Sequence, residues 1–431
     1  MGIAPWLVFA VLLTALIVAV VLATPWDPLA GASPPSADPG RDFSAAELAE
    51  LDAHQARIRP PTYTGLAVGL AVTVLLGMTP LGARLVTAAA RPLGGGWVWQ
   101  VLLGGLAVLL VIRLATIGFS AWAEAVRRAA GLSTRSWLGW AADLAKSFGL
   151  QAAATLVALL AMIALARALP RSWWAFGAVA AGAAVVALAF AYPLIVEPVF
   201  NRFTPLPPGE LRTSLLRMAD RSGVPVDEIL EADASKRTST LNAYVSGLSA
   251  TRRIVVFDTL TDRSPPAQVR SVVAHELGHA AEQDVRDGAL LGALGAAAAV
   301  CLLGGLLRMP ALLDRSGASG PDDPRIIALV LAVVAVAGLV SSPAQALVSR
   351  RVEARADVHA LDVTADPQAF AEMQRSLVLA AKADPEPPAI LFGLFASHPT
   401  GPQRIAMARA WADRQSADPV DDLAPVGGSA G

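Results

Sequence analysis

The sequence predicts a mainly α-helical membrane protein, in which a seven-helix transmembrane bundle carries a polar domain of helices and a small β-sheet. Hydrophobic residues make up 55% of the 431 residues and charged residues only 16%, and the mean hydropathy is +0.53. Soluble domains contain about 45–50% apolar and about 25% charged residues. A helix needs about 20 apolar residues to cross the hydrocarbon core of a bilayer. Seven stretches meet this length, at roughly residues 3–24, 64–83, 97–119, 148–168, 173–196, 287–307 and 326–347.

The first stretch is predicted to be a retained span rather than a cleaved leader. No Lys or Arg precedes it, and its apolar run is longer than the roughly 7–15 residues of a signal-peptide core.

Two polar blocks are predicted to form one domain on a single face of the membrane, because two spans separate them. In the first block, Leu211–Val224 has helical apolar spacing, and Leu241–Leu260 indicates two strands around a Ser/Gly turn. The tail has too few apolar residues to order itself. The chain thus divides into spans 1–5 (1–196), the first domain part (197–286), spans 6–7 (287–347), the second domain part (348–415) and a disordered tail (416–431).

Cysteine content and charge exclude several classes of function. Cys301 is the single cysteine, so the chain has no intrachain disulfide and no metal site built from several thiolates. Any metal must be bound by His, Asp or Glu. The net charge of -1 provides no basic field for nucleic acid, and we expect no nucleic-acid partner.

The stretch "VVAHELGHAAEQDV" carries a metal-binding pattern of the form H-E-x-x-H. Residues four apart share one face of a helix, so His275 and His279 can bind one metal, with Glu276 within reach of a water on that metal. An accidental match in a buried helix is the alternative. Catalytic zinc normally has three protein ligands and one open position, so the pattern predicts a further ligand elsewhere.

The second polar block offers that ligand in "SRRVEARADVHAL". Glu353 and Asp357 are four residues apart and share a helical face, with Glu353 as the third ligand. Asp357 then accepts a hydrogen bond from the free ring nitrogen of a ligand histidine and fixes its orientation. The spacing alone equally allows a solvated face, on which both acids pair with Arg350, Arg351 and Arg355.

Six stretches resemble the membrane zinc endopeptidases of the M48 family, in particular the CaaX prenyl protease group. The similarity covers most of residues 110–410 and implies a gluzincin-type zinc protease domain, split between the connection of spans 5 and 6 and the C-terminal region. The six are "HELGH", "SRRVEARAD", "PLIVEPVFNRFTPLPPGEL", "SKRTSTLNAYVSGLSATRRIVVFDTL", "GLSTRSWLGWAADLAKS" and "SHPTGPQRI".

The resemblance implies a role for each residue of the expected site. It implies one Zn²⁺ per chain, with Glu276 as general base and acid and Asp357 behind a ligand histidine. It places His398 and Arg404 near the developing oxyanion. It implies zinc ligation by His275, His279 and Glu353. It also implies that Asn242 and Ala243 contact the substrate backbone. No role is implied for His54 or His359.

These residues predict hydrolysis of peptide bonds in membrane-associated or membrane-delivered proteins, as in the CaaX prenyl proteases. A membrane-protein quality-control protease would use the same residues and differ only in substrate. A transporter or receptor with an inert zinc site is the alternative from another class. The lipid bilayer and the substrate are the expected partners, and the sequence does not indicate an oligomeric state.

The basic residues predict the orientation in the cell membrane, because cytoplasmic loops are enriched in Lys and Arg. The face of the polar domain carries eleven, in loops or beside spans: Arg41, Arg57, Arg59, Arg127, Arg128, Arg135, Lys146, Arg202, Arg286, Arg350 and Arg351. The opposite face carries seven: Arg84, Arg91, Arg167, Arg171, Arg308, Arg315 and Arg325. We therefore expect a multi-pass protein whose polar domain faces the cytoplasm.

Overall fold

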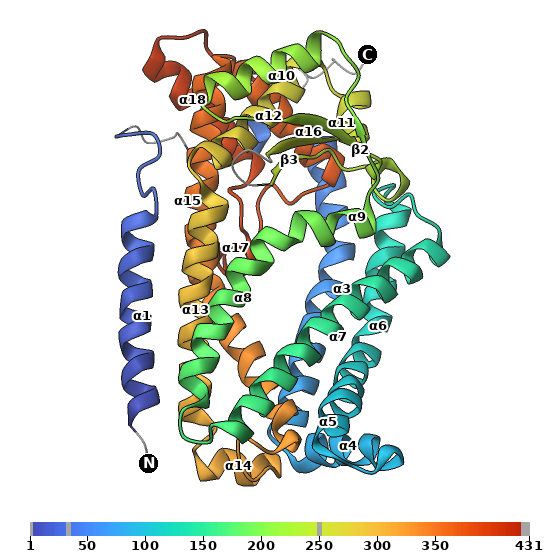
Figure 1. Cartoon of the computed structure of the whole chain (residues 1–431). Coiled ribbons are helices and arrows are strands. Elements are labelled where there is room, and N and C mark those ends of the chain that lie inside the picture. The colour runs from blue at the N-terminus through green and yellow to red at the C-terminus, as the bar shows by residue number, and fades with distance from the viewer. Residues whose placement is uncertain (1–2, 32–35, 248–251, 424–431) are drawn as a thin grey trace.

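The computed structural model describes residues 3–31, 36–247 and 252–423 as a bundle of long helices with a smaller polar domain at one end (Figure 1). Within these residues, seven helical segments are long and apolar enough to cross a membrane, which confirms the predicted number. They are α1 (Ala4–Ala23), α3 (Ala45–Gly77), α5 to α6 (Trp97–Ala129), α7 (Trp137–Ala168), α8 to α9 (Trp173–Phe200), α13 (Asp284–Leu306) and the segment ending with α15 (Pro324–Thr364).

The second span differs from its predicted range of 64–83. Helix α3 ends at Gly77, and a new helix, α4 (Pro80–Ala90), begins after Thr79. Proline has no N–H group and disfavours the helical conformation of the residue before it, so the continuous apolar run is broken at this point. A Ser44 capping box starts α3 at Ala45, and the helix therefore extends beyond the apolar stretch at its N-terminal end.

The seventh span is part of a helix that also enters the polar domain. The predicted range 326–347 lies almost entirely within α15 (Ile327–Thr364), which has no break at the predicted domain boundary. Glu353 lies on the same continuous helix as the apolar residues of the span.

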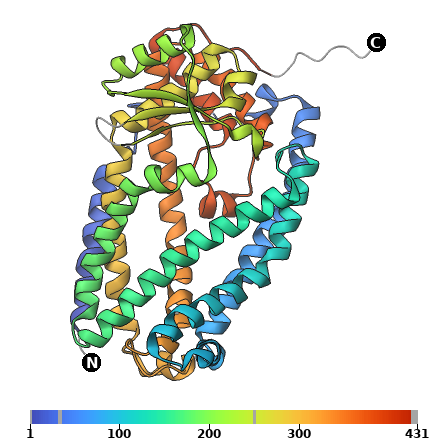
Figure 2. The ribbon, with the colours of Figure 1, turned by 45° about the vertical axis from the view of Figure 1, so that its right-hand side comes forward.

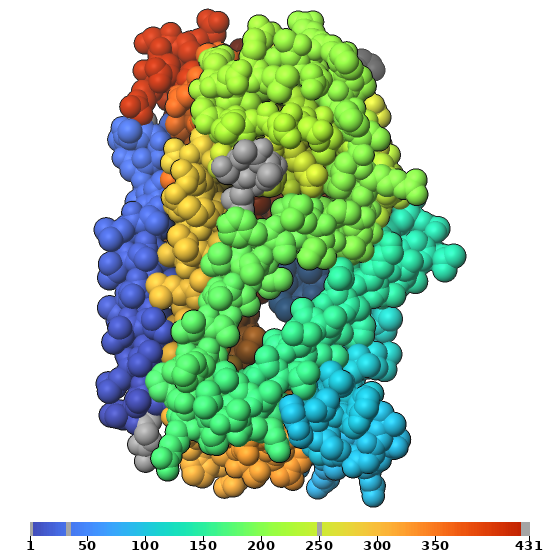
Figure 3. All heavy atoms as spheres, viewed as in Figure 1, coloured from blue at the N-terminus to red at the C-terminus, as the bar shows by residue number. Residues whose placement is uncertain are grey.

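Glycines allow close packing around α13, which lies beside α1 and α8 (Figure 1). A Cβ at Gly304 would lie 2.6 Å from Trp174, and a Cβ at Gly305 would lie 2.5 Å from Trp6. The bundle is not closed everywhere, since openings separate the atoms of α7 from those of α8 (Figure 3). Short helices lie outside the long spans: α2 (Pro39–Asp42) and α14 (Pro310–Ser316).

The polar domain contains the predicted small sheet, with strand order β1-β2-β4-β3. β2 and β4 are parallel, whereas β1 and β3 run antiparallel to their neighbours. The two strands predicted within Leu241–Leu260 are confirmed as β3 and β4, while residues 248–251 of the predicted turn lie outside the described residues. The strands are β1 (Phe203–Pro205), β2 (Glu228–Ala232), β3 (Ala243–Ser246) and β4 (Arg253–Phe257).

Residues from both polar blocks share one hydrophobic core, as predicted. Leu215, Ile254 and Leu277 come from the first block, Phe370 and Ile405 come from the second, and all five are fully buried. Figure 2 shows the strands and the helices of both blocks together at one end of the bundle. The helices are α10 (Glu210–Arg221), α11 (Asp258–Arg263), α12 (Pro266–Ala281), α16 (Pro367–Ala381), α17 (Ala389–Phe395) and α18 (Gly401–Gln415).

The first half of the expected tail lies against this domain. Val420 is only 4% exposed, and the backbone N–H of Asp421 donates to Gln368. Residues 416–423 are therefore ordered, although disorder was expected from Ser416 onward. A few apolar contacts and hydrogen bonds are enough to hold an extended segment against the domain. Residues 424–431 lie outside the described residues.

The loop between α6 (Gly105–Ala129) and α7 connects the bundle to the segment that leads into β3. Ser133 and Thr238 form an isolated β-bridge. The carboxylate of Glu124, which is completely buried, accepts hydrogen bonds from the Ser133 hydroxyl at 2.5 Å and from Arg135 at 2.9 Å. Glu124 thus fixes a loop of the bundle against the segment preceding β3.

We predict that Glu124→Ala lowers the free energy of unfolding by about 1–3 kcal/mol, because it removes the buried counter-ion of Arg135 and leaves this arginine only its longer contact with Asp143, at 3.4 Å. Thermal unfolding of the purified protein in detergent micelles measures this. Glu50→Ala is the control: it removes an exposed ion pair with Lys382, worth less than about 1 kcal/mol. Equal melting temperatures for the two variants would contradict the role of Glu124.

Candidate metal centre

Helix α12 presents the two histidines of the H-E-x-x-H pattern. Pro266 begins the helix, and Val273 and Leu277 anchor it in the core. The rings of His275 and His279 lie one turn apart, and their Nε2 atoms are 3.2 Å from each other. Both nitrogens therefore point to the same place.

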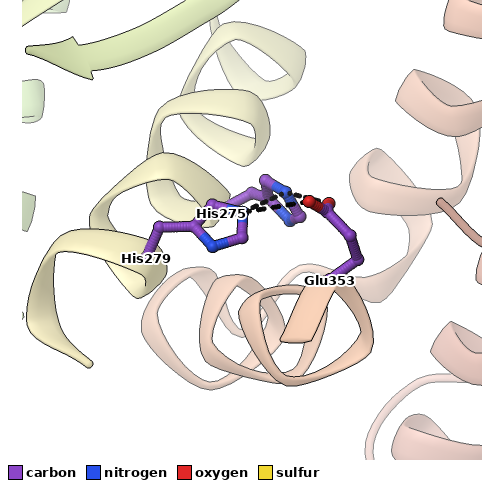
Figure 4. A group of neighbouring side chains, drawn as sticks. All are labelled: His275, His279 and Glu353. Carbon is purple, nitrogen blue, oxygen red and sulfur yellow. Dashed lines mark hydrogen bonds and ion pairs between the residues drawn. The ribbon is translucent and has the colours of Figure 1, made fainter. Parts of the chain in front are cut away.

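Glu353 reaches the same place from α15, as predicted (Figure 4). Its Oε2 lies 3.1 Å from Nε2 of His275, and its Oε1 lies 3.6 Å from Nε2 of His279. Ligand atoms about 2.0–2.2 Å from a four-coordinate metal stand about 3.3–3.6 Å apart. The three side chains thus have both the chemistry and the spacing of a metal site with one open position.

The close approach of α12 and α15 depends on the glycine inside the pattern. A Cβ at Gly278 would lie 3.0 Å from the Cβ of His359 and 3.2 Å from the Cα of Ala356. A larger residue at this position would require the two helices to shift by a few tenths of an ångström.

Asp357 accepts a hydrogen bond from the ring of His275, as predicted. Its Oδ1 accepts a hydrogen bond from Nδ1 of His275 at 2.8 Å, and its side chain is completely buried. Burial raises the pKa of this carboxyl, but Arg404 and His275 outweigh that effect and keep the pKa below its usual range. With Nδ1 engaged, Nε2 of His275 is left to bind the metal.

Arg404 lies on the Asp357 side of His275. Its Nε donates to Oδ2 of Asp357 at 2.8 Å, and its Nη2 donates to Oδ1. Nη2 is also 3.3 Å from Nδ1 of His275, whereas Glu353 lies at Nε2 of that ring. The guanidinium therefore contacts Asp357 and the Nδ1 side of His275, and its expected role near the oxyanion stays a prediction.

His279 has a matching support, which was not predicted. Its Nδ1 lies 2.8 Å from Oδ2 of Asp284, the first residue of α13. Arg355 donates to Asp284 and lies 3.2 Å from Glu282. Burial lowers the pKa of His279, but hydrogen bonds to Asp284 and Glu353 outweigh it and raise the pKa to about 10. An acid five residues after the second histidine, at a helix start, was the available signal.

Glu276 lies on α12 between the two ligand histidines in sequence. Its carboxylate has no hydrogen-bond partner or ion pair among the described residues. Burial raises the pKa of this carboxyl above its usual range. A partly buried carboxyl beside a metal site is placed to accept and return a proton.

His398 approaches the site from the segment preceding α18. Its Nε2 is 3.3 Å from Oε2 of Glu353, and 56% of its side chain remains exposed. Ser397 Oγ lies 2.9 Å from its Nδ1. His398 thus borders the metal position while facing open space, as expected for a residue that meets substrate.

Asn242 and Ala243 lie at the start of the edge strand β3, which packs beside α12. The carbonyl of Asn242 accepts from the Phe257 N–H on one side. No described strand pairs with the other side of β3, so this edge can accept an extended chain. The two remaining histidines do not join the ligand group: His54 is buried on α3, and His359 Nε2 contacts Ser222 Oγ at 3.0 Å.

Comparisons with known proteins match both parts of the chain. Residues 205–412 match peptidase family M48, and residues 52–202 match a family described as CAAX prenyl protease N-terminal, five membrane helices. The chain is 28% identical to the uncharacterized metalloprotease YhfN of Bacillus subtilis over 64% of this chain and 66% of YhfN. It is 49% identical to CAAX prenyl protease 1 of Saccharomyces cerevisiae over 20% of this chain and 19% of that protein.

The fold is similar to that of S. mikatae Ste24p in its crystal structure. The TM-score is 0.76, and the match covers 94% of this chain and 98% of the other at 21% identity. The alignment with YhfN spans just under two thirds of that relative, and the alignment with the yeast protease spans about a fifth of it.

We predict that Glu353→Ala lowers the metal content of the purified protein from about one ion per chain to well below half an ion, because only two ligands remain. Metal analysis after dialysis measures the content. His359→Ala is the matched control, since this histidine lies on α15 outside the ligand group, and it should keep the metal. Full metal content in Glu353→Ala would show that another residue is the third ligand.

Proposed function

Because the chain belongs to peptidase family M48, we propose that it is a zinc-dependent endopeptidase of the cell membrane. Its substrates are membrane-associated or membrane-delivered proteins or peptides. The observation that carries the proposal is the position of Glu276 beside three converging ligand atoms. A structural zinc site is closed by four protein ligands, whereas here three ligands leave one position open and the partly buried Glu276 lies next to them.

Two nitrogens and one carboxylate fit zinc, for which His₂Glu is a known catalytic ligand set. When bound, zinc supplies the Lewis acidity that acidifies water and polarises a carbonyl group. An inert zinc site in a transporter or receptor is not supported, because Glu276 is not needed as a ligand.

Glu276 takes a proton from the attacking water and returns it to the leaving amine. Its burial raises its pKa, which makes the carboxylate a stronger base and the acid a ready donor near neutral pH. His398 is exposed next to the metal position, and we assign it to hydrogen bonding with the oxyanion that forms on the substrate.

The edge of β3 provides a place for the substrate backbone. An extended peptide can add to an unpaired sheet edge through main-chain hydrogen bonds. Asn242 and Ala243 begin this strand beside α12, so a peptide paired with them passes the metal position. We assign Arg404 to positioning, since its contacts are with Asp357 and with the far side of His275.

A substrate attached to the membrane fits the location of the site. The ligand helices lie where the polar domain meets the bundle (Figure 1), and α15 carries both the seventh span and Glu353. Relatives named CAAX prenyl protease 1 support a membrane-associated protein substrate.

We predict that Glu276→Gln keeps its fold and metal but loses activity by about 10²–10⁴-fold, because an amide cannot accept the proton of water. Cleavage of a fluorescent unfolded protein and of a prenylated peptide is followed in parallel with metal content. Glu372→Gln on α16 is the control with the same chemical change outside the site. Near-normal cleavage by metal-loaded Glu276→Gln would refute the general-base role.

We also propose that the polar domain faces the cytoplasm, on the basis of the eleven basic residues on its face against seven opposite. In a Cys301→Ser background, a cysteine replaces exposed Asp314 in α14 or exposed Gln415 at the end of α18. With a membrane-impermeant thiol reagent, we predict that intact cells are labelled only at position 314. Permeabilised cells control for reactivity at both positions. Labelling of intact cells only at position 415 would reverse the orientation.

A further inference from the structure

A cavity opens on the polar domain, between α10, α12, α16 and the end of α15. Its volume is about 360 Å³, and its lining includes Arg217, Arg221, Arg270, Ser271 and Thr364. Helix α10 lies at the end of the molecule farthest from α4 and α14 (Figure 1). We call this cavity the arginine pocket; the residues of the metal centre do not line it.

Three arginines and two acids line the arginine pocket, which gives the lining a net formal charge of +1 (three minus two). Arg217 and Arg221 are one turn apart on α10, an arrangement in which like charges repel, and Arg270 adds a third charge from α12. None of the three has an ion pair or side-chain hydrogen bond with the described residues. Of the two acids in the lining, Asp366 is engaged in capping α16 through the Ala369 N–H at 3.0 Å, and Glu210 is the other.

A further feature of the pocket favours a hydrogen-bonding ligand. Ser271 is only 2% exposed, and its hydroxyl has no hydrogen-bond partner among the described residues. A buried hydroxyl without a partner costs stability. The N-terminus of α16, a helix of 15 residues, also lies in the lining, but the Asp366 carboxylate already caps it.

We propose that the arginine pocket binds the phosphoryl group of a small water-soluble phosphorylated molecule. The planar guanidinium group donates paired hydrogen bonds that match the oxygens of phosphate. The cavity has room for a phosphoryl group and part of a small organic moiety. A lipid headgroup does not fit the location, because the pocket lies on the polar domain beside α10, away from the spans.

The pocket also adjoins both helices that carry the ligands of the metal. Ser271 is one turn before His275 on α12, and Thr364 is the last residue of α15, which carries Glu353. An anion bound between α10, α12 and α16 holds these ends together. Binding therefore stabilises the folded polar domain by mass action.

The test is a calorimetric titration of the full-length, metal-loaded protein in phosphatidylcholine nanodiscs. Inorganic phosphate and AMP are the two probes, at constant ionic strength set with sodium chloride. We expect saturable binding of at least one probe, weakened about tenfold or more in the double variant Arg217→Gln/Arg221→Gln, because charge-assisted hydrogen bonds are lost. Equal affinities identify inorganic phosphate as the ligand, and tighter binding of AMP identifies a phosphorylated organic molecule.

The control is Arg212→Gln, which removes the same charge from α10 at a position outside the lining. It should bind like the unaltered protein. Both arginines of the double variant are exposed, so folding is expected to survive, and circular dichroism verifies it. Absence of saturable binding, equal weakening by Arg212→Gln, or undiminished binding in the double variant would each overturn the proposal. The last outcome would place the anion elsewhere, for example at the metal.

Discussion

The contact between α12 and α15 is the constraint on which the rest of the site depends. It brings a pair of histidines together with a distant acid: His275 and Glu353 are 78 residues apart in the sequence. Two features hold this contact: Gly278, which leaves room for the backbone of α15, and Asp357, which binds His275 across the interface. Asp357 is completely buried, and an unpaired carboxylate in that position would cost several kcal/mol. Its pairing with Arg404 therefore ties α18 to the same interface.

Helix α15 transmits the geometry of the membrane bundle to the metal centre. Its first half packs in the bundle, where Ile327 and Leu329 are fully buried, and its second half carries Glu353 and Asp357. Because the helix is continuous, although Pro343 lies within it, the position of Glu353 is linked to that of the span. A second connection runs through Glu124, which fixes the loop after α6 against the segment leading to β3. The metal side and the substrate side of the site are thus each anchored to the bundle by a separate element.

The sequence predicted the elements whose signals are local. Apolar length identified the seven spans, and the four-residue spacings of His275 with His279 and of Glu353 with Asp357 placed each pair on one helical face. Helix ends were less predictable: the break before Pro80 lies inside an apolar run, and α15 has no break where its composition changes. Hydropathy reports the environment of a segment, and the continuity of the backbone is a separate property.

Contacts between distant segments could not be predicted from spacing. Arg404 was expected near the oxyanion, but whether it faces the substrate or Asp357 depends on how α18 docks against α15. Asp284 and Arg355 lie 71 residues apart, and their meeting follows from the packing of α12, α13 and α15. The residues were visible in the sequence, but their partners were set by tertiary structure.

These long-range contacts give the two ligand histidines equivalent surroundings. Each ring contacts a carboxylate through Nδ1, and each carboxylate is paired with an arginine: Asp357 with Arg404, and Asp284 with Arg355. A carboxylate alone favours the doubly protonated ring, in which Nε2 carries a proton and cannot bind a metal. Burial lowers the pKa of His275, and Arg404 acts in the same direction, but Asp357 and Glu353 outweigh both and hold the pKa above its usual value. The two carboxylates thus orient the rings through Nδ1, and the Nε2 atoms of both rings are directed to the same place, 3.2 Å from each other.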